Sequence, residues 1–252
     1  MTTKRLTAVT IWIHVVLMLA AYFGLATFFD FPDVLRRSAP EMLAAFNAER
    51  GPVIASYTLF MLSQVAFMAV ALLLHRALAR RGGSTALNVA TGFGLVAGFA
   101  QAIGFSRWVF VVPWIADLTA DPSTSAATQA AAMVTLEGFH RVVGVAIGEH
   151  LFFWCEAIWA IGLALHLLRE AQPLRRLAAV LATAGALVAV YTFEQHGGPF
   201  AALGPLNVAA HGALLFWLLG LSLVLWRGRG VGRPALALLT SAYLAIVVPS
   251  FL

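Results

Sequence analysis

The chain has 252 residues, of which 61% are hydrophobic and 11% are charged. Soluble domains carry about a quarter charged residues, so this composition excludes an ordinary water-soluble protein. The formal net charge of +5 does not indicate a nucleic-acid partner, because the basic residues lie in short stretches between apolar runs and form no basic domain.

Apolar stretches along the chain predict an all-α fold, a polytopic transmembrane helix bundle in which residues 1–252 form a single domain. A helix needs about 20 apolar residues to cross the hydrocarbon of a bilayer. In chain order the seven predicted spans are 7–29, 53–75, 86–110, 134–168, 174–193, 206–226 and 235–252. The seventh is short and ends with the chain, so a bundle of six spans remains an alternative.

The length and residues of three spans indicate where these spans end. The first, 7–29, is longer than a usual signal-peptide core, so we expect it to stay uncleaved, with cleavage near Gly24–Ala26 as the alternative. The third is expected to run on until Pro113 stops it. The fourth has 35 residues and would reach about 52 Å as an α-helix, so it must tilt or project beyond the hydrocarbon.

The segments between spans predict the orientation. With the N-terminus in the cytoplasm, 11 of the 16 basic residues lie in cytoplasmic segments, 3 lie in external ones, and Arg107 and Arg141 lie within or beside spans. The C-terminus of a seven-span chain is then external. Met42–Phe46 is expected to form a short amphipathic helix on the outer surface, and 117–133 to form a loop with a turn at Asp121–Pro122.

Two glycine repeats, Gly94–Gly98 and Gly144–Gly148, predict close packing of the third span against the fourth. Such repeats also occur by chance in apolar helices, so an accidental origin stays open. If Gly98 lies opposite Gly148 in antiparallel helices, Arg107 comes within about one turn of three polar residues. These are Glu137, His140 and Arg141.

Polar side chains gather near the predicted external ends of the spans, and Glu149 and His150 lie roughly 12 Å deeper than Arg141 by helical rise. Charged groups inside a bilayer are costly, so they usually pair, face a cavity or carry a function. The pattern predicts an outward-facing polar pocket, with a ring of paired, hydrated side chains as the alternative for its shallow members. The candidate residues are Arg107, Glu137, His140, Arg141, Glu149, His150, Glu194, Asn207 and His211.

Histidine and carboxylate side chains in this set have the chemistry of zinc, iron or copper ligands. The candidate metal ligands are His140, Glu149, His150, Glu194, His196 and His211. Their spacing is not diagnostic, since Glu137 and His140 give only one copy of the Glu-x-x-His motif that di-metal bundles use twice. A transition metal or a haem therefore stays open as a cofactor. The one cysteine, Cys155, is interpreted as a small buried apolar residue.

Two segments, Arg107–Ala116 (RWVFVVPWIA) and Gly144–Leu151 (GVAIGEHL), resemble a bacterial family of multi-pass membrane proteins that is catalogued only as a domain of unknown function. The resemblance covers nearly the whole chain. It implies a location in the bacterial cytoplasmic (inner) membrane, and it points to Arg107, Glu149 and His150 as motif positions. It implies no activity, cofactor or substrate.

The leading functional hypothesis is that the polar pocket handles a small ligand, an ion or a proton, in a transporter-like or sensory role. Glu149 would be the protonatable site, His150 and His211 would tune it, and Arg107 would anchor an anionic group or hold Glu137. A membrane-embedded metal- or haem-dependent enzyme and a structural partner subunit of a membrane complex are the alternatives. The expected partners are the lipid bilayer and a small ligand or ion; the oligomeric state is not predicted.

Overall fold

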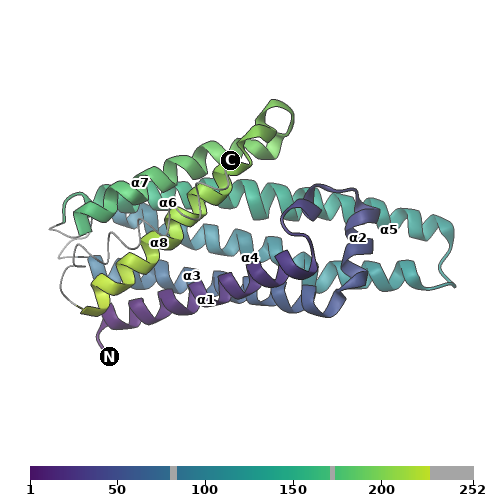
Figure 1. The fold of residues 1–252 in the computed structure, drawn as a ribbon, viewed down its shortest axis with the longest axis horizontal. Helices are drawn as coiled ribbons and strands as arrows, with labels where there is room; N and C mark the ends of the chain where they lie inside the picture. The colour runs from purple at the N-terminus through teal and green to yellow at the C-terminus, as the bar shows by residue number, and fades with distance from the viewer. Residues whose placement is uncertain (80–83, 171–173, 228–252) are drawn as a thin grey trace. The chain divides into compact units, whose positions relative to one another are not determined.

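The computed structural model describes residues 1–79, 84–170 and 174–227, and every regular element in these ranges is a helix. Six helical segments there are long and apolar enough to cross a membrane: Thr3–Phe28, Arg50–Leu78, Thr85–Ala120, Ala126–Leu167, Leu174–His196 and Pro205–Arg227 (Figure 1). The predicted all-α, multi-pass architecture is therefore confirmed. The seventh predicted span, 235–252, lies outside the described residues.

The helices group into two compact units, and several helices contribute to both. Unit 1 comprises Met1–Ile13, Ala66–Gly98 and His150–Leu252, and unit 2 comprises His14–Val65 and Phe99–Glu149. The shared helices are α1 (Thr3–Phe28), α3 (Arg50–Leu78) and α4 (Thr85–Ala120). A single domain over 1–252 remains a prediction.

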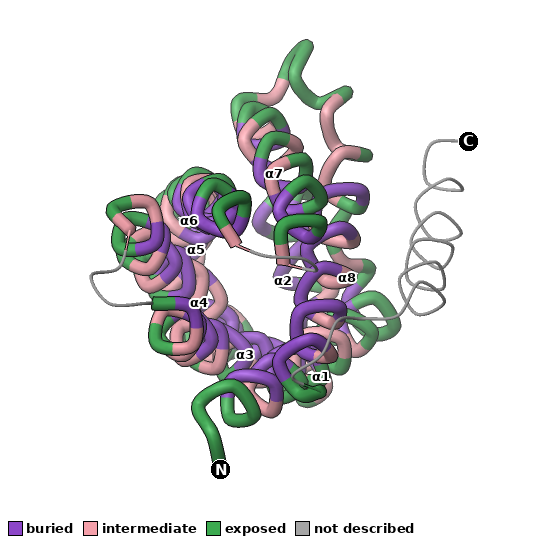
Figure 2. Tube along the Cα trace, turned by 90° about the vertical axis from the view of Figure 1, so that its left-hand side faces the viewer, coloured by how far each residue is buried: buried purple, intermediate pink, exposed green. Residues whose placement is uncertain are grey.

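Exposed side chains along the predicted spans are often large and apolar, as at Trp12, Phe99 and Phe110. Each long helix carries both buried and exposed residues, which Figure 2 shows as purple and green stretches of the same tube. In water such exposed rings would be costly, whereas lipid tails solvate them. The exposed residues of the helices therefore agree with contact to a bilayer.

In unit 2 the chain between α1 and α3 forms η1 (Asp33–Arg36) and α2 (Ala39–Ala48). The backbone N–H and the hydroxyl of Ser38 donate to the Glu41 carboxylate at 3.0 and 2.6 Å, which fixes the start of α2. The amphipathic helix predicted near Met42–Phe46 therefore exists. Its apolar residues are buried in the protein core, and its place on the outer surface remains a prediction.

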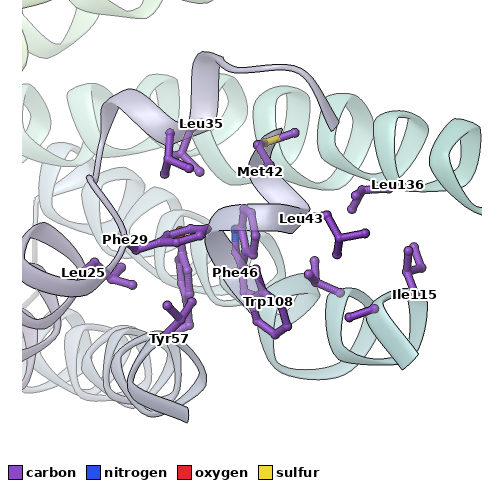
Figure 3. Packing of buried hydrophobic residues seen from close by; sticks show 14 of the residues in the cluster. Leu25, Phe29, Leu35, Met42, Leu43, Phe46, Tyr57, Trp108, Ile115 and Leu136 are labelled. Carbon is purple, nitrogen blue, oxygen red and sulfur yellow. The ribbon is translucent and has the colours of Figure 1, made fainter. Parts of the chain in front are cut away.

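Aromatic rings form the centre of this core (Figure 3). Trp108 stacks on Tyr57 with ring centroids 5.2 Å apart and an interplanar angle of 7°, and it meets Phe29 edge-on at 4.9 Å. Such aromatic pairs add about 0.5–1.5 kcal/mol each beyond the burial of their area. They fix the position of α4, and with it the side chain of Arg107 that precedes Trp108.

Helix α4 continues through Pro113 to Ala120, so the predicted stop at Pro113 is wrong. A proline inside a helix removes one hydrogen bond and crowds a carbonyl, at a cost of about 3 kcal/mol. Val112 and Ile115 lie on either side of it and are buried in the core of unit 2. Their packing contacts in that core favour continuation of the helix past the proline.

The predicted loop 117–133 is shorter than expected, because α4 reaches Ala120 and α5 (Ala126–Phe139) begins soon after it. The turn at Asp121–Pro122 is confirmed, and the Asp121 carboxylate accepts from the Ser123 backbone N–H at 2.8 Å. The Ser123 hydroxyl also donates to this carboxylate. Both hydrogen bonds, and the one from the hydroxyl most, hold the pKa of Asp121 below its usual value.

The fourth span continues from α5 through a π-helix, η2 (His140–Leu151), into α6 (Phe152–Leu167). A π-helix closes its hydrogen bonds one residue later than an α-helix, is rare, and occurs mostly at functional sites. Its buried residues are His140, Gly144 and Gly148, which recur every four positions. This recurrence gives the π-helix a face of two glycines and one histidine.

Unit 1 contains α6, α7 (Leu174–Tyr191) and α8 (Pro205–Arg227), with α7 packed against both of the others (Figure 1). Two short helices, η3 (Thr192–His196) and η4 (Gly198–Leu203), connect α7 to α8. Gly197 and Gly198 lie where η3 meets η4. Both glycines have positive φ angles, 67° and 57°, which other residues adopt only with strain.

Candidate functional site

The predicted pocket residues fall into two groups, one in each unit. Unit 2 holds Arg107, Glu137, His140, Arg141 and Glu149, and unit 1 holds His150, Glu194, His196, Asn207 and His211. A single outward-facing pocket that joins both groups remains a prediction. Of these candidates Arg107 and His140 are buried, and those of unit 1 are half-buried or exposed.

The guanidinium of Arg107 is the most deeply buried cation of unit 2, with 5% of the residue exposed. Its Nη1 donates to the carbonyl of Gly104, and its Nη2 lies 3.5 Å from Nδ1 of His140. Its Cζ lies 5.4 Å from the ring centroid of Trp108, a cation–π distance. Within the described part of the chain, no carboxylate forms an ion pair with Arg107.

The hydrogen bonds of His140 identify its protonation state. Its Nε2 lies 2.9 Å from the carbonyl oxygen of Leu35, and a carbonyl only accepts, so Nε2 carries the hydrogen. Nδ1 faces the Nη2 donor of Arg107, so it offers its lone pair. His140 is thus a neutral imidazole beside a cation, and the predicted proximity of Arg107 to His140 is confirmed.

Glu137 and Arg141 do not join this cluster. Arg141 Nε donates to Glu137 Oε1 at 2.7 Å, one turn along the same helix, and Arg141 is exposed. The hypothesis that Arg107 holds Glu137 is therefore wrong. The two residues match the alternative interpretation, a hydrated surface ion pair.

The glycines of the π-helix face α4 at two levels. A Cβ atom added to Gly148 would lie 2.6 Å from Cα of Gly104, and one added to Gly144 would lie 2.6 Å from Cζ of Arg107. Close packing of the third span on the fourth is thus confirmed, but the predicted register is wrong, because Gly148 faces Gly104 and not Gly98. Gly104, which belongs to neither of the two glycine repeats, is the partner of Gly148 on α4.

Glu149 has a cationic partner from outside its own helix. Arg36 Nη2, in η1, donates to Glu149 Oε2 at 2.9 Å. Sequence spacing missed this contact, because nothing in the pattern relates the loop that contains Arg36 to the fourth span. Glu149, the predicted protonatable site, is therefore an ion-paired carboxylate at the edge of unit 2.

Unit 1 buries a carboxylate that was not among the candidates. Glu156 of α6 is 7% exposed, and its Oε2 lies 3.2 Å from Nε2 of His211 on α8, an ion-pair distance without the alignment of a hydrogen bond. His211 Nδ1 lies 3.0 Å from the carbonyl oxygen of Asn207 and donates to it. The only sequence signal for Glu156 was its depth in the span and its spacing of seven from Glu149.

The surroundings of this pair come from α6, α7 and α8. Asn207 Nδ2 donates to the phenol oxygen of Tyr191 at 3.1 Å. The ring centroid of His211 lies 6.5 Å from that of Tyr191 and 5.5 Å from that of Phe153, both edge-on. Tyr191 is the titratable side chain that faces the pair from α7. Asn207 and His211 thus lie close together, and their membership in one pocket remains a prediction.

The other candidates of unit 1 lie around η3. The His150 and His196 rings have centroids 5.2 Å apart, and His150 Nδ1 lies 3.4 Å from the carbonyl oxygen of Thr192. Glu194 accepts from the side-chain amide of Gln195 at 2.9 Å. His196 is exposed, so this group lies nearer the surface than the Glu156–His211 pair.

Metal-binding geometry is not evident in the described ranges. In residues 1–79, 84–170 and 174–227, no three His, Cys, Asp or Glu side chains gather closely enough to hold a metal ion. The candidate ligands His140 and Glu149 have their own partners in unit 2, Leu35 and Arg36 respectively. The metal and haem alternatives therefore gain no support from the side-chain positions.

No curated protein and no solved structure matches the chain. One family model matches it, over residues 11–227, and its description is domain of unknown function DUF4386. This range includes both segments that carry the resemblance in the sequence, Arg107–Ala116 and Gly144–Leu151. Six candidate membrane spans and a family match over most of the length together show that the protein is a multi-pass membrane protein of the DUF4386 family.

Proposed function

We propose that this protein takes up and releases a proton at the Glu156–His211 pair, in a transporter-like or sensory role in the bacterial cytoplasmic membrane. The observation that carries the proposal is the arrangement of the His211 ring between two oxygens. Nδ1 faces a carbonyl and therefore carries a hydrogen, while Nε2 faces a carboxylate oxygen at 3.2 Å.

This geometry requires one further proton in the pair. If Nε2 and Glu156 were both deprotonated, a nitrogen lone pair would face a negative oxygen. A proton on either atom removes the repulsion and leaves the pair neutral overall, as an imidazolium with a carboxylate or as an imidazole with a carboxylic acid. Neutrality matters here, because a charged Asp, Lys or Arg at the centre of a membrane helix costs about 2.5–3.5 kcal/mol on insertion scales.

The position of the pair links proton binding to the helices. Glu156 belongs to α6 and His211 to α8, and α7 packs against both. Loss of the proton leaves a buried negative charge, and gain of another leaves a buried positive one, so either event changes the attraction between α6 and α8. A change of this kind is what proton-coupled transporters and pH sensors use.

Among the described residues, no contact favours a metal- or haem-dependent enzyme or a purely structural subunit over this function. Glu156 is also a better proton site than the predicted Glu149. Its partner is an imidazole, which exchanges a proton near neutral pH, whereas the partner of Glu149 is a guanidinium, which does not.

Infrared difference spectroscopy of the full-length protein in lipid, recorded during a pH titration, tests the proposal. We expect the wild type to show a carboxyl C=O band that changes with pH, and Glu156→Gln to lack that band. Glu137→Gln is the matched control, because its carboxylate forms a surface ion pair with Arg141 and the band should survive. An unchanged band in Glu156→Gln would refute protonation of the Glu156 carboxylate in this pair.

A further inference from the structure

Three buried hydrogen-bond donors of unit 2 have no acceptor within the described residues. They are the phenol Oη of Tyr57, the guanidinium Nε of Arg107 and the indole Nε1 of Trp108. Tyr57 and Trp108 are each 1% exposed, and Arg107 is 5% exposed. A buried donor without a partner costs about 1–3 kcal/mol, so three of them in one place need an explanation.

The three donors belong to side chains that touch one another. The rings of Tyr57 and Trp108 are stacked, with centroids 5.2 Å apart, and Figure 3 shows them side by side. The Arg107 Cζ lies 5.4 Å from the Trp108 ring centroid. Two helices supply them, Tyr57 from α3 and the other two from α4, so the group is built by the packing of the aromatic core.

All three side chains need a hydrogen-bond acceptor. The indole N–H and the guanidinium N–H only donate, and a phenol donates readily to an anion. The guanidinium also carries a positive charge that no carboxylate of the described chain neutralises by an ion pair. A negatively charged oxygen satisfies all of these requirements, since hydrogen bonds to charged acceptors are roughly twice as strong as neutral ones.

Three carboxylates of unit 2 form ion pairs with other cations. Glu149 pairs with Arg36, Asp117 with Arg50, and Glu137 with Arg141. The Glu149 carboxylate also interacts electrostatically with Arg107 and Tyr57, without an ion pair to Arg107. On its other side Arg107 meets a neutral histidine and a carbonyl, which accept hydrogen bonds and carry no charge. Gly144 leaves room for the flat guanidinium, since a Cβ there would lie 2.6 Å from its Cζ.

We infer that unit 2 binds an oxyanion, a carboxylate or phosphate-type group, through Tyr57, Arg107 and Trp108. This site goes beyond the proton function proposed for the Glu156–His211 pair and uses none of its residues. The oxyanion comes either from solution or from the headgroup of an anionic lipid. Both sources present the same chemistry to the three donors.

Thermal unfolding of the full-length protein in phosphatidylcholine nanodiscs tests the site in two arms. The first adds sodium phosphate, compared with sodium chloride at equal ionic strength. The second replaces part of the phosphatidylcholine with phosphatidylglycerol. A ligand that binds only the folded protein raises the unfolding midpoint, and we expect a rise of about 2–4 °C in the arm that supplies the right source.

Tyr57→Phe is the decisive variant, because it removes one donor and keeps the aromatic ring. Without the oxyanion it should unfold at the wild-type temperature or slightly above, since it loses an unpaired hydroxyl. With the oxyanion it should lose at least half of the wild-type rise, and Arg107→Gln should lose all of it. Tyr22→Phe is the matched control, because Tyr22 lies exposed on α1.

The outcomes separate this site from the proton function. Glu156→Gln should keep the full oxyanion-dependent rise, so either proposal can fail without the other. A wild type that responds to neither arm beyond the chloride control would overturn the oxyanion site. So would a Tyr57→Phe variant that keeps the whole wild-type rise.

Discussion

Unit 2 buries a guanidinium beside a neutral imidazole, whereas unit 1 buries a carboxylate beside a half-buried imidazole. Arg107 keeps its charge at every accessible pH, so its contacts with an aromatic ring, a carbonyl and His140 must stabilise a fixed charge. In the function proposed above, Glu156 and His211 instead adjust their charge by gaining or losing one proton. Unit 2 thus holds a fixed charge, whereas unit 1 holds the pair proposed to exchange a proton.

The largest effect should come from breaking the pair of unit 1. His211→Leu leaves Glu156 buried without its partner, and removal of one member of a buried pair costs about 3 kcal/mol or more. The free energy of unfolding in mixed micelles measures the loss. Because a protonated carboxyl is cheaper to bury than a carboxylate, the loss should shrink as the pH falls.

A second substitution distinguishes an unpaired charge from simple loss of packing. Glu156→Leu combined with His211→Leu removes both charges and should recover most of the stability, since apolar replacements of buried pairs are often neutral. If the double variant is as unstable as His211→Leu, the proton-sharing account of the pair is wrong. Arg107 should show no comparable rescue, because no carboxylate partner exists in the described chain to be removed with it.

The next largest effect should come from the glycine contact that supports Arg107. Gly148→Ala places a Cβ 2.6 Å from Cα of Gly104, and overpacking of this kind costs about 1–3 kcal/mol. Gly138→Ala is the matched control, since a Cβ there meets nothing within 4 Å. It should stabilise by about 0.5–1 kcal/mol, because alanine favours a helix over glycine.

The measurement for this pair of variants is again the free energy of unfolding, taken at one pH for both. Opposite signs for Gly148→Ala and Gly138→Ala would confirm that the contact of α4 with the π-helix, and not glycine content, matters. Equal effects of the two variants would contradict the close approach at Gly104. Neither variant should alter the carboxyl band assigned to Glu156, which belongs to unit 1.

A smaller effect is expected at the edge of unit 2. Arg36→Ala removes the partner of Glu149, a partly exposed ion pair, and should cost at most about 1 kcal/mol. The cost should fall with added salt, which screens exposed charges. A cost as large as that of His211→Leu would mean that Glu149 is buried in the same way as Glu156, and would remove the contrast between the units.

Much of the fold could be predicted from the sequence, because length and apolarity decide whether a helix crosses a membrane. The register of the third and fourth spans could not, since the partner of Gly148 is Gly104, which lies outside the glycine repeat that was used to align them. The π-helix from His140 to Leu151 was not anticipated either. The continuation of α4 past Pro113 was also missed, because it depends on burial of Val112 and Ile115 by distant parts of unit 2.

The candidate site was predictable only in part. Packing of the two glycine-containing spans placed Arg107 close to His140, and the ion pair of Glu137 with Arg141 follows from their separation of four residues. Arg36 and Tyr57 were missed, because each reaches its place through tertiary packing of a loop or a neighbouring helix. Glu156 was visible as a deep carboxylate, but its partner on α8 was not.

The smallest expected effect is the response of Glu41, at the start of α2 in unit 2, to acid. The carboxyl of Glu41 lies outside the membrane spans, and hydrogen bonds from Ser38, the side-chain one first, hold its pKa below the usual value of 4.5. A lowered pKa contributes stability above the usual value and loses it as the pH falls through the lowered one. Unit 2 should therefore respond to acid first at the start of α2.

Hydrogen exchange of the Met42 and Leu43 amides should accelerate as the pH falls below about 4.5, relative to the intrinsic exchange rate. Glu41→Gln should abolish the extra acceleration, while Glu156→Gln should leave it intact. Acceleration that persists in Glu41→Gln would place the acid-sensitive group elsewhere in unit 2, and would weaken the distinction between fixed charges there and a titrating pair in unit 1.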